Sequence, residues 1–342
     1  MSFSFENYSK TGFVIGEIAQ SHDGSLGQCY AYVDAVAKAG GHSVKFQTHI
    51  ADAESTPGEP WRVKFSKQDE SRFDYWKRME FTKEQWRGLK EYTESKGLVF
   101  LSSAFSFEAV DLLEEIGMVA WKLASGEINN YPLLEKIAAT KKPVMISSGM
   151  SYWKELDKAV ELFKSKNIPY AIMQCTSAYP CPPDQIGLNV ISEMKERYGC
   201  PVGLSDHSGT IYPGLAAAAL GMDILEVHIT FHKGLFGPDV PASVTMEEFQ
   251  QLVEGVKNIK TMLANPINKD EKAQDLQVLR NLFTKSVVCK TALTKGTVVT
   301  ADMLSFKKPG TGFAAERLGE LLGKKLAIDV EANHFLKPED LV

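Results

Sequence analysis

The feature that most constrains the fold is a regular alternation of short apolar runs with amphipathic stretches of helical period. The apolar runs are nearly continuous, which is typical of strands buried on both faces of a parallel sheet. We predict eight such strands: Phe13–Ile18, Ser43–Gln47, Val99–Ser103, Ala120–Ser125, Pro143–Ser147, Tyr170–Thr176, Val202–Ser205 and Ile224–Ile229. Helices are expected at Gln28–Ala39, Lys83–Lys96, Phe107–Ile116, Leu133–Ala139, Tyr152–Lys166, Asn189–Arg197, Tyr212–Leu220 and Met246–Leu263.

Eight β-then-α units within about 250 residues predict an α/β fold of the (β/α)8 TIM-barrel type. A doubly wound open sheet is the structural alternative. We assign the barrel to residues 1–264 and a polar, turn-rich linker to residues 265–285. Beyond the linker, shorter β-like runs alternate with turns, which predicts a small separate domain over residues 286–342; the runs are Ser286–Lys290, Thr297–Val299 and Lys325–Ala327.

Composition excludes several classes of protein. A formal net charge of -5 provides no basic surface for nucleic acid. No stretch approaches the roughly 20 apolar residues of a membrane span, and the N-terminus lacks the basic-then-apolar pattern of a secretory signal. The 5 cysteines are an odd number without metal-like spacing and indicate reduced thiols. We therefore expect a cytoplasmic, soluble protein with neither a nucleic-acid nor a membrane partner.

Polar residues close every predicted strand. The eight groups are Glu17 with Gln20 and His22, Lys45 with Gln47, Ser102 with Ser103, Lys122 with Ser125 and Glu127, Ser147 with Ser148, Thr176 to Tyr179, Ser205 with Asp206 and His207, and Glu226 with His228. In a barrel these carboxyl ends converge on one mouth, where such enzymes carry out their chemistry. Serine and aspartate also cap helices, but capping does not account for a polar group at every strand. The pattern predicts an enzyme.

Two of these strands carry a lysine inside an apolar run. Lys45 lies in Val44-Lys45-Phe46-Gln47, and Lys122 precedes Leu123-Ala124-Ser125-Gly126-Glu127. A buried ammonium is costly unless an anion or a carboxylate meets it. Either lysine alone is compatible with an exposed strand end. Their recurrence predicts a site for a phosphate or a carboxylate.

In this order, the motifs along the chain resemble those of the sialic acid synthase family, the phosphoenolpyruvate-dependent synthases of nonulosonic acids. The matching motifs are Gly16–His22, Val44–Thr48, Lys122–Tyr131, Ser147–Met150, Gln174–Pro180, Gly203–His207 and Gly237–Asp239. The resemblance implies that the small C-terminal domain is antifreeze-like (a SAF domain). It also implies a domain-swapped homodimer in which this domain covers the partner's barrel mouth, although the sequence alone also allows a monomer.

The family resemblance implies a reaction. The methylene carbon of phosphoenolpyruvate adds to the aldehyde of an N-acetylated amino sugar, water attacks the resulting cationic carbon, and phosphate leaves by C–O cleavage. Positions matching the family's phosphoenolpyruvate contacts are Lys45, Ser103, Lys122, Ser125, Ser147 and Ser205. His207 and His228 match the ligands of a divalent metal, with Mn²⁺ expected and Mg²⁺ or Co²⁺ as alternatives; a pair of buried core histidines is the competing interpretation.

Two acidic positions of the family are Glu17 and Glu226. Glu226 is expected to hold sugar hydroxyls or to move a proton, and Glu17 to orient or deliver the attacking water; either is alternatively a counter-ion to a lysine. On the sugar side the expected contacts are Gln47, Glu127, Tyr179, Asp239 and Lys308, whereas Asn130 is expected to cap a helix. His22, on the first loop, is either a residue that closes over the substrate or an exposed loop histidine.

The chain departs from the family pattern at Ser177, Val227, His232 and Lys308. Lys308 stands where bacterial members carry an arginine, and lysine cannot make the forked planar contact. The acceptor therefore stays open among N-acetylmannosamine, its 6-phosphate and a diacetamido hexose, the last as in pseudaminic or legionaminic acid synthases. Two other functions compete: a Schiff-base pyruvate aldolase using Lys122, and a non-catalytic glycan-binding or structural protein.

Overall fold

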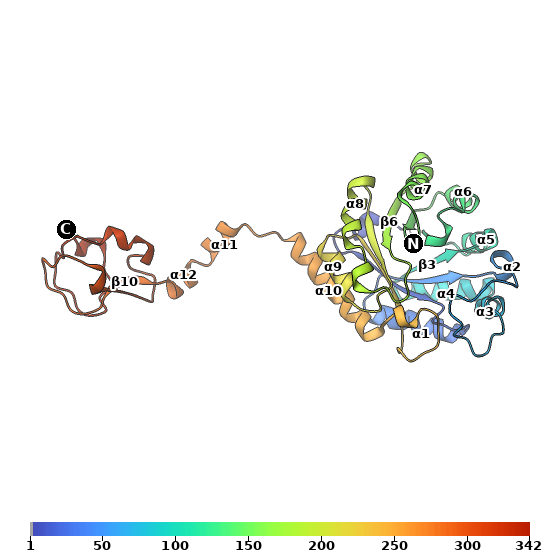
Figure 1. The fold of residues 1–342 in the computed structure, drawn as a ribbon, viewed down its shortest axis with the longest axis horizontal. Coiled ribbons are helices and arrows are strands. Elements are labelled where there is room, and N and C mark those ends of the chain that lie inside the picture. The colour runs from blue at the N-terminus through green and yellow to red at the C-terminus, as the bar shows by residue number, and fades with distance from the viewer. Residues whose placement is uncertain (1–2) are drawn as a thin grey trace. The chain divides into compact units, whose positions relative to one another are not determined.

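The structure is a computed structural model that describes residues 3–342. Its chain divides after Asn265 into two compact units, labelled by element in Figure 1. The first unit is built on eight parallel strands: β1 (Phe13–Ala19), β2 (Ser43–Thr48), β3 (Val99–Ala104), β4 (Trp121–Leu123), β5 (Val144–Ser147), β6 (Tyr170–Cys175), β7 (Val202–Asp206) and β8 (Ile224–Thr230).

The strands follow the order β3-β2-β1-β8-β7-β6-β5-β4. β1 pairs in parallel with both β2 and β8, so the first and last strands of the series lie side by side. This pairing confirms the TIM-type barrel, nearly closed, and excludes the doubly wound sheet. The observed β4 is shorter than the predicted strand Ala120–Ser125, because the chain turns into a 3-10 helix at Ser125–Glu127.

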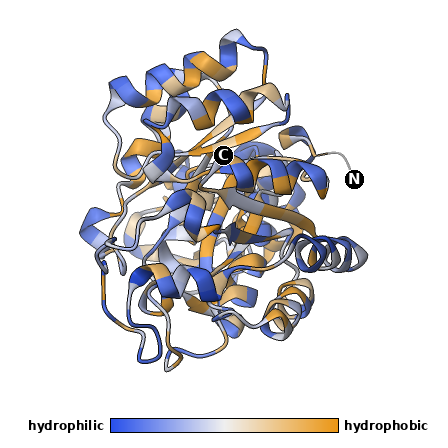
Figure 2. Cartoon of the chain, turned by 90° about the vertical axis from the view of Figure 1, so that its right-hand side faces the viewer, coloured by the Kyte–Doolittle hydropathy of each residue, from blue (hydrophilic) through white to orange (hydrophobic). Residues whose placement is uncertain are grey.

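Helices surround the barrel, with hydrophilic outer faces around hydrophobic strands (Figure 2). The predicted ones are observed as α1 (Leu26–Lys38), α4 (Lys83–Ser95), α5 (Phe107–Glu115), α6 (Tyr131–Ala139), α7 (Trp153–Ser165), α8 (Leu188–Tyr198), α9 (Tyr212–Ala219) and α10 (Met246–Ala264). Asn130 caps α6 as predicted, accepting a hydrogen bond from the Leu133 amide. Two helices that we did not predict, α2 (Ala51–Glu54) and α3 (Arg72–Met79), lie between β2 and α4.

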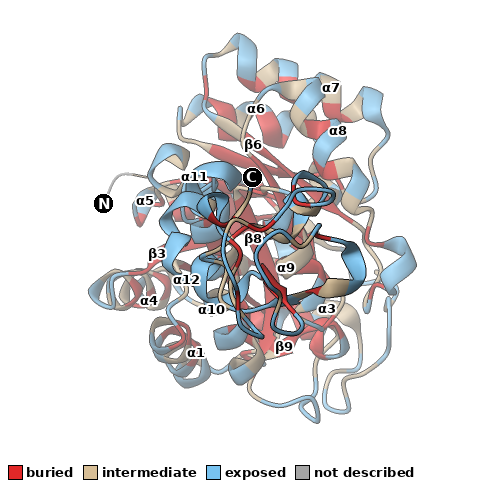
Figure 3. Cartoon of the chain, turned by 90° about the vertical axis from the view of Figure 1, so that its left-hand side faces the viewer, coloured by how far each residue is buried: buried red, intermediate tan, exposed pale blue. Residues whose placement is uncertain are grey.

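Inward-facing positions change character along each strand. Because strand side chains alternate between faces, Ile15 and Glu17 of β1 share one face, as do Leu101 and Ser103 of β3. The amino-terminal half of the barrel interior is a buried apolar cluster. Burial is densest in the barrel strands and on the faces of the helices that pack on them (Figure 3). Because the apolar cluster fills the amino-terminal half of the barrel interior, a polar site can form only at the carboxyl ends of the strands.

The second unit is small and has its own core, which includes Val287, Leu304, Leu321 and Leu336. It contains one antiparallel pair, β10 (Ser286–Cys289) with β11 (Leu304–Lys307). The predicted runs Thr297–Val299 and Lys325–Ala327 make single bridges rather than strands. The segment predicted as a linker carries two short helices, α11 (Lys269–Asp275) and α12 (Gln277–Phe283).

Candidate active site

A small polar cavity of about 50 Å³ lies at the carboxyl ends of the strands; we call it the inner cavity. It brings together all six residues predicted to bind phosphoenolpyruvate and all four predicted catalytic residues. Its lining consists of Glu17, Lys45, Gln47, Ser103, Lys122, Ala124, Ser125, Ser147, Cys175, Tyr179, Ser205, His207, Glu226 and His228. Residues from eight different strands or their ends therefore meet in one place.

Two buried ion pairs cross the inner cavity. Lys45 Nζ lies 2.8 Å from Glu17 Oε1, and Lys122 Nζ lies 2.8 Å from Glu226 Oε1. Lys45 also approaches Glu226 Oε2 at 4.0 Å and the Ser103 hydroxyl at 3.4 Å. The counter-ion role that the sequence left open for the two carboxylates is thus present in the structure. Among the interactions of residues 3–342, one oxygen of each carboxylate is buried without a hydrogen-bond partner, so it lacks the donor that buried oxygens usually have.

The surroundings push the two carboxylates in opposite directions. Burial raises the pKa of Glu17 to about 7, against the lowering effect of Lys45. Burial also raises the pKa of Glu226, but Lys122 and Lys45 outweigh it and bring that pKa to about 2. Such a separation is how one site keeps one carboxylate charged and another able to exchange a proton near neutral pH.

The two histidines of the inner cavity are neutral at pH 7. Burial and His228 lower the pKa of His207 to about 3, and burial and Lys45 do the same for His228. His207 Nδ1 donates to the Thr176 carbonyl at 2.8 Å, which leaves its Nε2 lone pair free. Within the described residues 3–342, His228 Nδ1 is buried without a hydrogen-bond partner, and the two ring centroids lie 5.3 Å apart.

These histidines fit a divalent metal in part. Neutral imidazoles with free nitrogens are the ligand form, and a backbone carbonyl orients His207 as in many metal sites. Within residues 3–342, however, no group of three or more His, Cys, Asp or Glu side chains is arranged to hold a metal ion. Asp239 Oδ2 lies 4.0 Å from His228 Nδ1, but the other oxygen of this carboxylate is already engaged by Arg62 at 2.8 Å. A metal held here would have open positions for other ligands.

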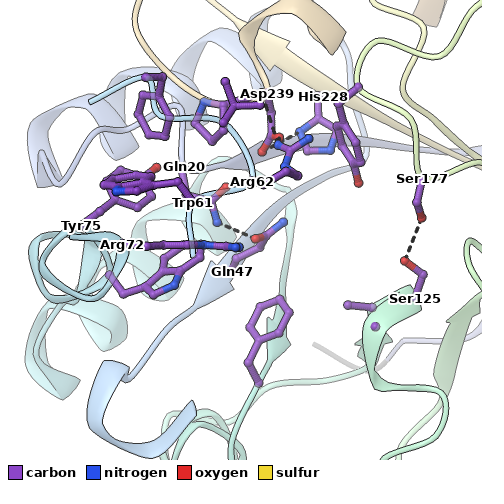
Figure 4. A pocket seen from close by; sticks show the side chains of 18 of the residues that line it. Gln20, Gln47, Trp61, Arg62, Arg72, Tyr75, Ser125, Ser177, His228 and Asp239 are labelled. Atoms are coloured by element: carbon purple, nitrogen blue, oxygen red, sulfur yellow. Dashed lines mark hydrogen bonds and ion pairs between the residues drawn. The ribbon is translucent and has the colours of Figure 1, made fainter. Parts of the chain in front are cut away.

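A larger cavity of about 340 Å³, which we call the outer cavity, adjoins the inner one through Gln47, Ser125, Tyr179 and His228. Figure 4 shows Arg62 beside Asp239 in this cavity. Arg62 Nη2 donates to Asp239 Oδ1 at 2.8 Å, and its guanidinium stacks over the Tyr179 ring at 4.5 Å. The outer cavity is thus lined by three of the predicted sugar contacts, Gln47, Tyr179 and Asp239.

The remaining predicted sugar contacts lie elsewhere. Glu127 lines a separate cavity of about 280 Å³, the side cavity, which shares Gln47, Arg72, Trp76 and Phe105 with the outer one. Lys308 belongs to the second unit, where its ammonium lies 5.0 Å from the centre of the Phe283 ring. His22 lines none of the three cavities. It is buried against Phe81 and accepts a hydrogen bond from the Gly24 amide, so it is not an exposed loop histidine.

Of the departures from the family pattern within residues 3–342, Ser177 alone lines one of these three cavities. Ser177 lines the outer cavity and hydrogen-bonds to Ser125. Val227 alternates with Glu226 and His228, so it points away from the site into the core between strands and helices. His232 is exposed.

The connection between β2 and α4 contributes cavity residues that were not predicted from the sequence. This connection supplies Arg62, Arg72 and Trp76 to the outer cavity and His49 and Glu54 to the side cavity. The length of this connection could have indicated a functional role in the sequence, because long connections in compact domains are commonly functional. Separately, no helix within residues 3–342 is long and apolar enough to cross a membrane.

Fold and site together define a TIM barrel with a buried lysine, serine and histidine site at its mouth. Comparison with known proteins agrees: the NeuB family model matches residues 32–268, and the SAF domain model matches residues 284–342. The chain belongs to the NeuB family, and its relatives include named synthases, which supports an enzyme.

Two curated relatives are each 32% identical to this chain. They are N,N'-diacetyllegionaminic acid synthase of Campylobacter jejuni, covering 92% of this chain and 96% of that one, and human N-acetylneuraminate-9-phosphate synthase, covering 96% and 92%. Among solved structures, N-acetylneuraminic acid synthetase from Leptospira borgpetersenii in complex with citrate matches with a TM-score of 0.69 and 29% identity, covering 80% of this chain and 93% of that one.

Proposed function

We propose that this protein condenses phosphoenolpyruvate with an N-acetylated amino-sugar aldose, giving a nonulosonic acid and phosphate, and is therefore a transferase of the N-acetylneuraminate synthase type. The observation that carries the proposal is the inner cavity, where two buried lysines and four serines surround a space beside two neutral histidines. Ammonium and hydroxyl donors of this kind bind phosphate and carboxylate groups. The neighbouring outer cavity offers room for a sugar.

In the proposed reaction the methylene carbon of phosphoenolpyruvate forms a C–C bond to the aldehyde carbon, and the aldehyde oxygen takes up a proton. Water adds to the carbon that carried the phosphate, and the C–O bond breaks so that the bridging oxygen leaves with phosphate. Lys45, Lys122, Ser103, Ser125, Ser147 and Ser205 are proposed to hold the phosphate and carboxylate. A divalent metal, Mn²⁺ before Mg²⁺ or Co²⁺, is assigned to His207 and His228, where it would polarise the aldehyde.

The two carboxylates receive different tasks. Glu226 contacts Lys122 and lies within 4.0 Å of Lys45, so we assign it as the lasting counter-ion that also accepts from sugar hydroxyls. Glu17 contacts only one of these lysines, and its buried Oε2 has no partner, so we assign to it the handling of the proton of the attacking water. General acid–base catalysis of this kind typically contributes about 10²–10⁴ in rate.

The acceptor is proposed to occupy the outer cavity, in contact with Gln47, Tyr179 and Asp239. Arg62 is added to this set because it binds Asp239 and stacks on Tyr179. We keep Lys308 as a contact made by the second unit of a domain-swapped partner subunit. The helix α12 supports a homodimer, because Val278, Leu282 and Phe283 are 73%, 55% and 63% exposed and such a face favours burial. A cytoplasmic location agrees with the 5 free cysteines.

The competing Schiff-base reaction is disfavoured by the environment of Lys122. A lysine nucleophile must lose its proton, and Glu226 at 2.8 Å stabilises the ammonium instead. A non-catalytic binding protein would bind a ligand at this cavity without releasing phosphate, so turnover separates that alternative from the proposed function.

The test is phosphate release from phosphoenolpyruvate across a panel of acceptors, with manganese and with chelator. The expected result is release that requires an amino-sugar acceptor and stops with chelator. Phosphoenolpyruvate labelled with ¹⁸O at the bridging position should transfer the label to phosphate. Label retained in the organic product, or a lysine trapped by borohydride, would overturn the proposed mechanism.

A further inference from the structure

The side cavity has a polar wall that no part of the proposed reaction uses. Besides the residues shared with the outer cavity, it is lined by His49, Glu54, Ser55, Glu59 and Glu127. His49 is sandwiched between Trp76, at 4.0 Å between ring centroids, and Phe105, at 4.6 Å. The wall therefore combines carboxylates with flat apolar surfaces.

His49 Nε2 lies 2.8 Å from the Gln20 amide nitrogen, which can only donate, and 3.3 Å from Gln47 Oε1, so the shorter contact favours the neutral tautomer with its proton on Nδ1. Its Nδ1–H donates to Glu54 Oε1 at 2.5 Å, and its Nε2 accepts from the Gln20 amide at 2.8 Å. Glu54 consequently has no cation beside it. Its side chain is only 8% exposed, and its second oxygen, Oε2, is buried with no hydrogen-bond partner among residues 3–342. Native proteins satisfy nearly all such atoms, so this oxygen indicates a missing donor.

The other charges around the side cavity do not supply that donor. Arg72 is engaged by Glu59 at 3.2 Å, and Arg62 by Asp239 at 2.8 Å. Glu127 accepts from the Asn130 amide but, within residues 3–342, forms no ion pair with a lysine or an arginine. Burial raises the pKa of Glu127, the Asn130 amide lowers it, and the charge of Glu54 raises it again. A cavity with two uncompensated carboxylates repels a phosphate and attracts N–H donors.

We propose that the side cavity is a subsite for a second acylamino group on an uncharged acceptor sugar. The N–H of this group donates to Glu54, and its acyl methyl packs against Phe105, since the Trp76 ring is already contacted by His49 and Arg72. The acceptor class is then a diacetamido sugar rather than a sugar phosphate. This inference rests on the proposed function, since it assumes that the outer cavity holds the sugar.

The experiment measures binding rather than turnover, using alditols, which lack the reactive aldehyde. The monoacetamido alditol of N-acetylmannosamine, a diacetamido alditol and the monoacetamido alditol 6-phosphate are titrated calorimetrically into the full-length protein with saturating phosphoenolpyruvate. We expect the diacetamido alditol to bind at least about tenfold more tightly than the monoacetamido one, and the 6-phosphate at least about tenfold more weakly. Phosphate release with the matching aldoses tests the synthase reaction separately.

A variant then locates the effect. Glu54→Gln should reduce the advantage of the diacetamido alditol to less than about threefold while leaving the affinity for the monoacetamido alditol unchanged. Glu135→Gln, a matched change at an exposed ion pair on α6, should leave all three affinities as in the wild type. The proposal is overturned if the wild-type protein prefers the 6-phosphate, binds the mono- and diacetamido alditols equally or binds none of the three. A uniform loss of affinity in Glu54→Gln would overturn it as well.

Discussion

Replacing Lys122 with methionine should destabilise the barrel by about 3 kcal/mol. Lys122 and Glu226 are 3% and 5% exposed and form a direct ion pair, so the variant leaves the Glu226 carboxylate buried without its ion-pair partner. Removing one partner of a buried pair typically costs about 3–5 kcal/mol. We expect the lower end, because the Ser205 hydroxyl at 2.9 Å and Lys45 at 4.0 Å continue to stabilise Glu226.

The assay is urea unfolding followed by tryptophan fluorescence. All 5 tryptophans precede residue 266, so the signal reports the barrel and not the second unit. A loss of about 3 kcal/mol corresponds to a fall of roughly 6–12 °C in Tm for a domain of this size. Affinity for phosphoenolpyruvate should fall in the same variant, since it also loses a proposed ligand.

A double-mutant cycle provides the decisive control. Adding Glu226→Leu to Lys122→Met removes the stranded carboxylate, while Lys45 keeps Glu17 as its partner. Most of the lost stability should return, because replacing a whole buried pair by apolar residues is often neutral. A single variant that loses less than about 1 kcal/mol, or a double variant whose losses simply add, would refute the argument that the pair is energetically coupled.

Three further predictions concern other parts of the molecule. His207→Ala should abolish chelator-sensitive turnover and weaken manganese binding without changing the circular dichroism spectrum; unchanged metal affinity would eliminate the ligand role. His22→Gln should flatten the pH dependence of the free energy of unfolding. Burial lowers the pKa of His22 from 6.5 to about 3, so protonation favours the unfolded chain as pH falls below 6.5, by up to about 2 kcal/mol at pH 5. Between pH 7 and pH 5, urea unfolding should therefore show a smaller loss of stability in the variant than in the wild type. Lys308→Ala should raise the Michaelis constant of the acceptor severalfold, with little effect on that of phosphoenolpyruvate. An unchanged Michaelis constant for the acceptor would mean that Lys308 of the second unit does not contact the sugar.

The barrel was predictable because each of its strands is buried on both faces and therefore reads as a continuous apolar run. The polar residues at the strand ends were predictable for a related reason: strand order and strand direction alone bring Lys45, Lys122 and Glu226 to one mouth. Their pairing was not predictable. Whether Glu17 or Glu226 pairs with a given lysine depends on distances of a few ångströms across the barrel, and the sequence is compatible with either pairing.

Residues that line the outer and side cavities were not predicted, for a different reason. Arg62 reaches Asp239 across 177 positions of sequence, from the irregular stretch of chain between α2 and α3. Glu54 reads in the sequence as one more exposed charge of a short polar segment. Only the packing of His49 between Trp76 and Phe105 turns it into a buried carboxylate. Loop residues of this kind gain their roles from tertiary contacts, which no local pattern encodes.

The charges of the inner cavity bear on why a metal would be needed there. Glu226 matches Lys122, Glu17 matches Lys45 whenever its carboxyl is charged, and the two histidines are neutral, so the cavity offers little net charge to a multiply charged anion. Bringing phosphoenolpyruvate into this buried space is costly unless a counter-charge enters with it. A divalent cation on His207 and His228 would supply two positive charges beside the lysines. On this reasoning manganese should tighten phosphoenolpyruvate binding even without an acceptor, and His207→Ala should remove that gain while leaving the weaker, metal-independent binding intact.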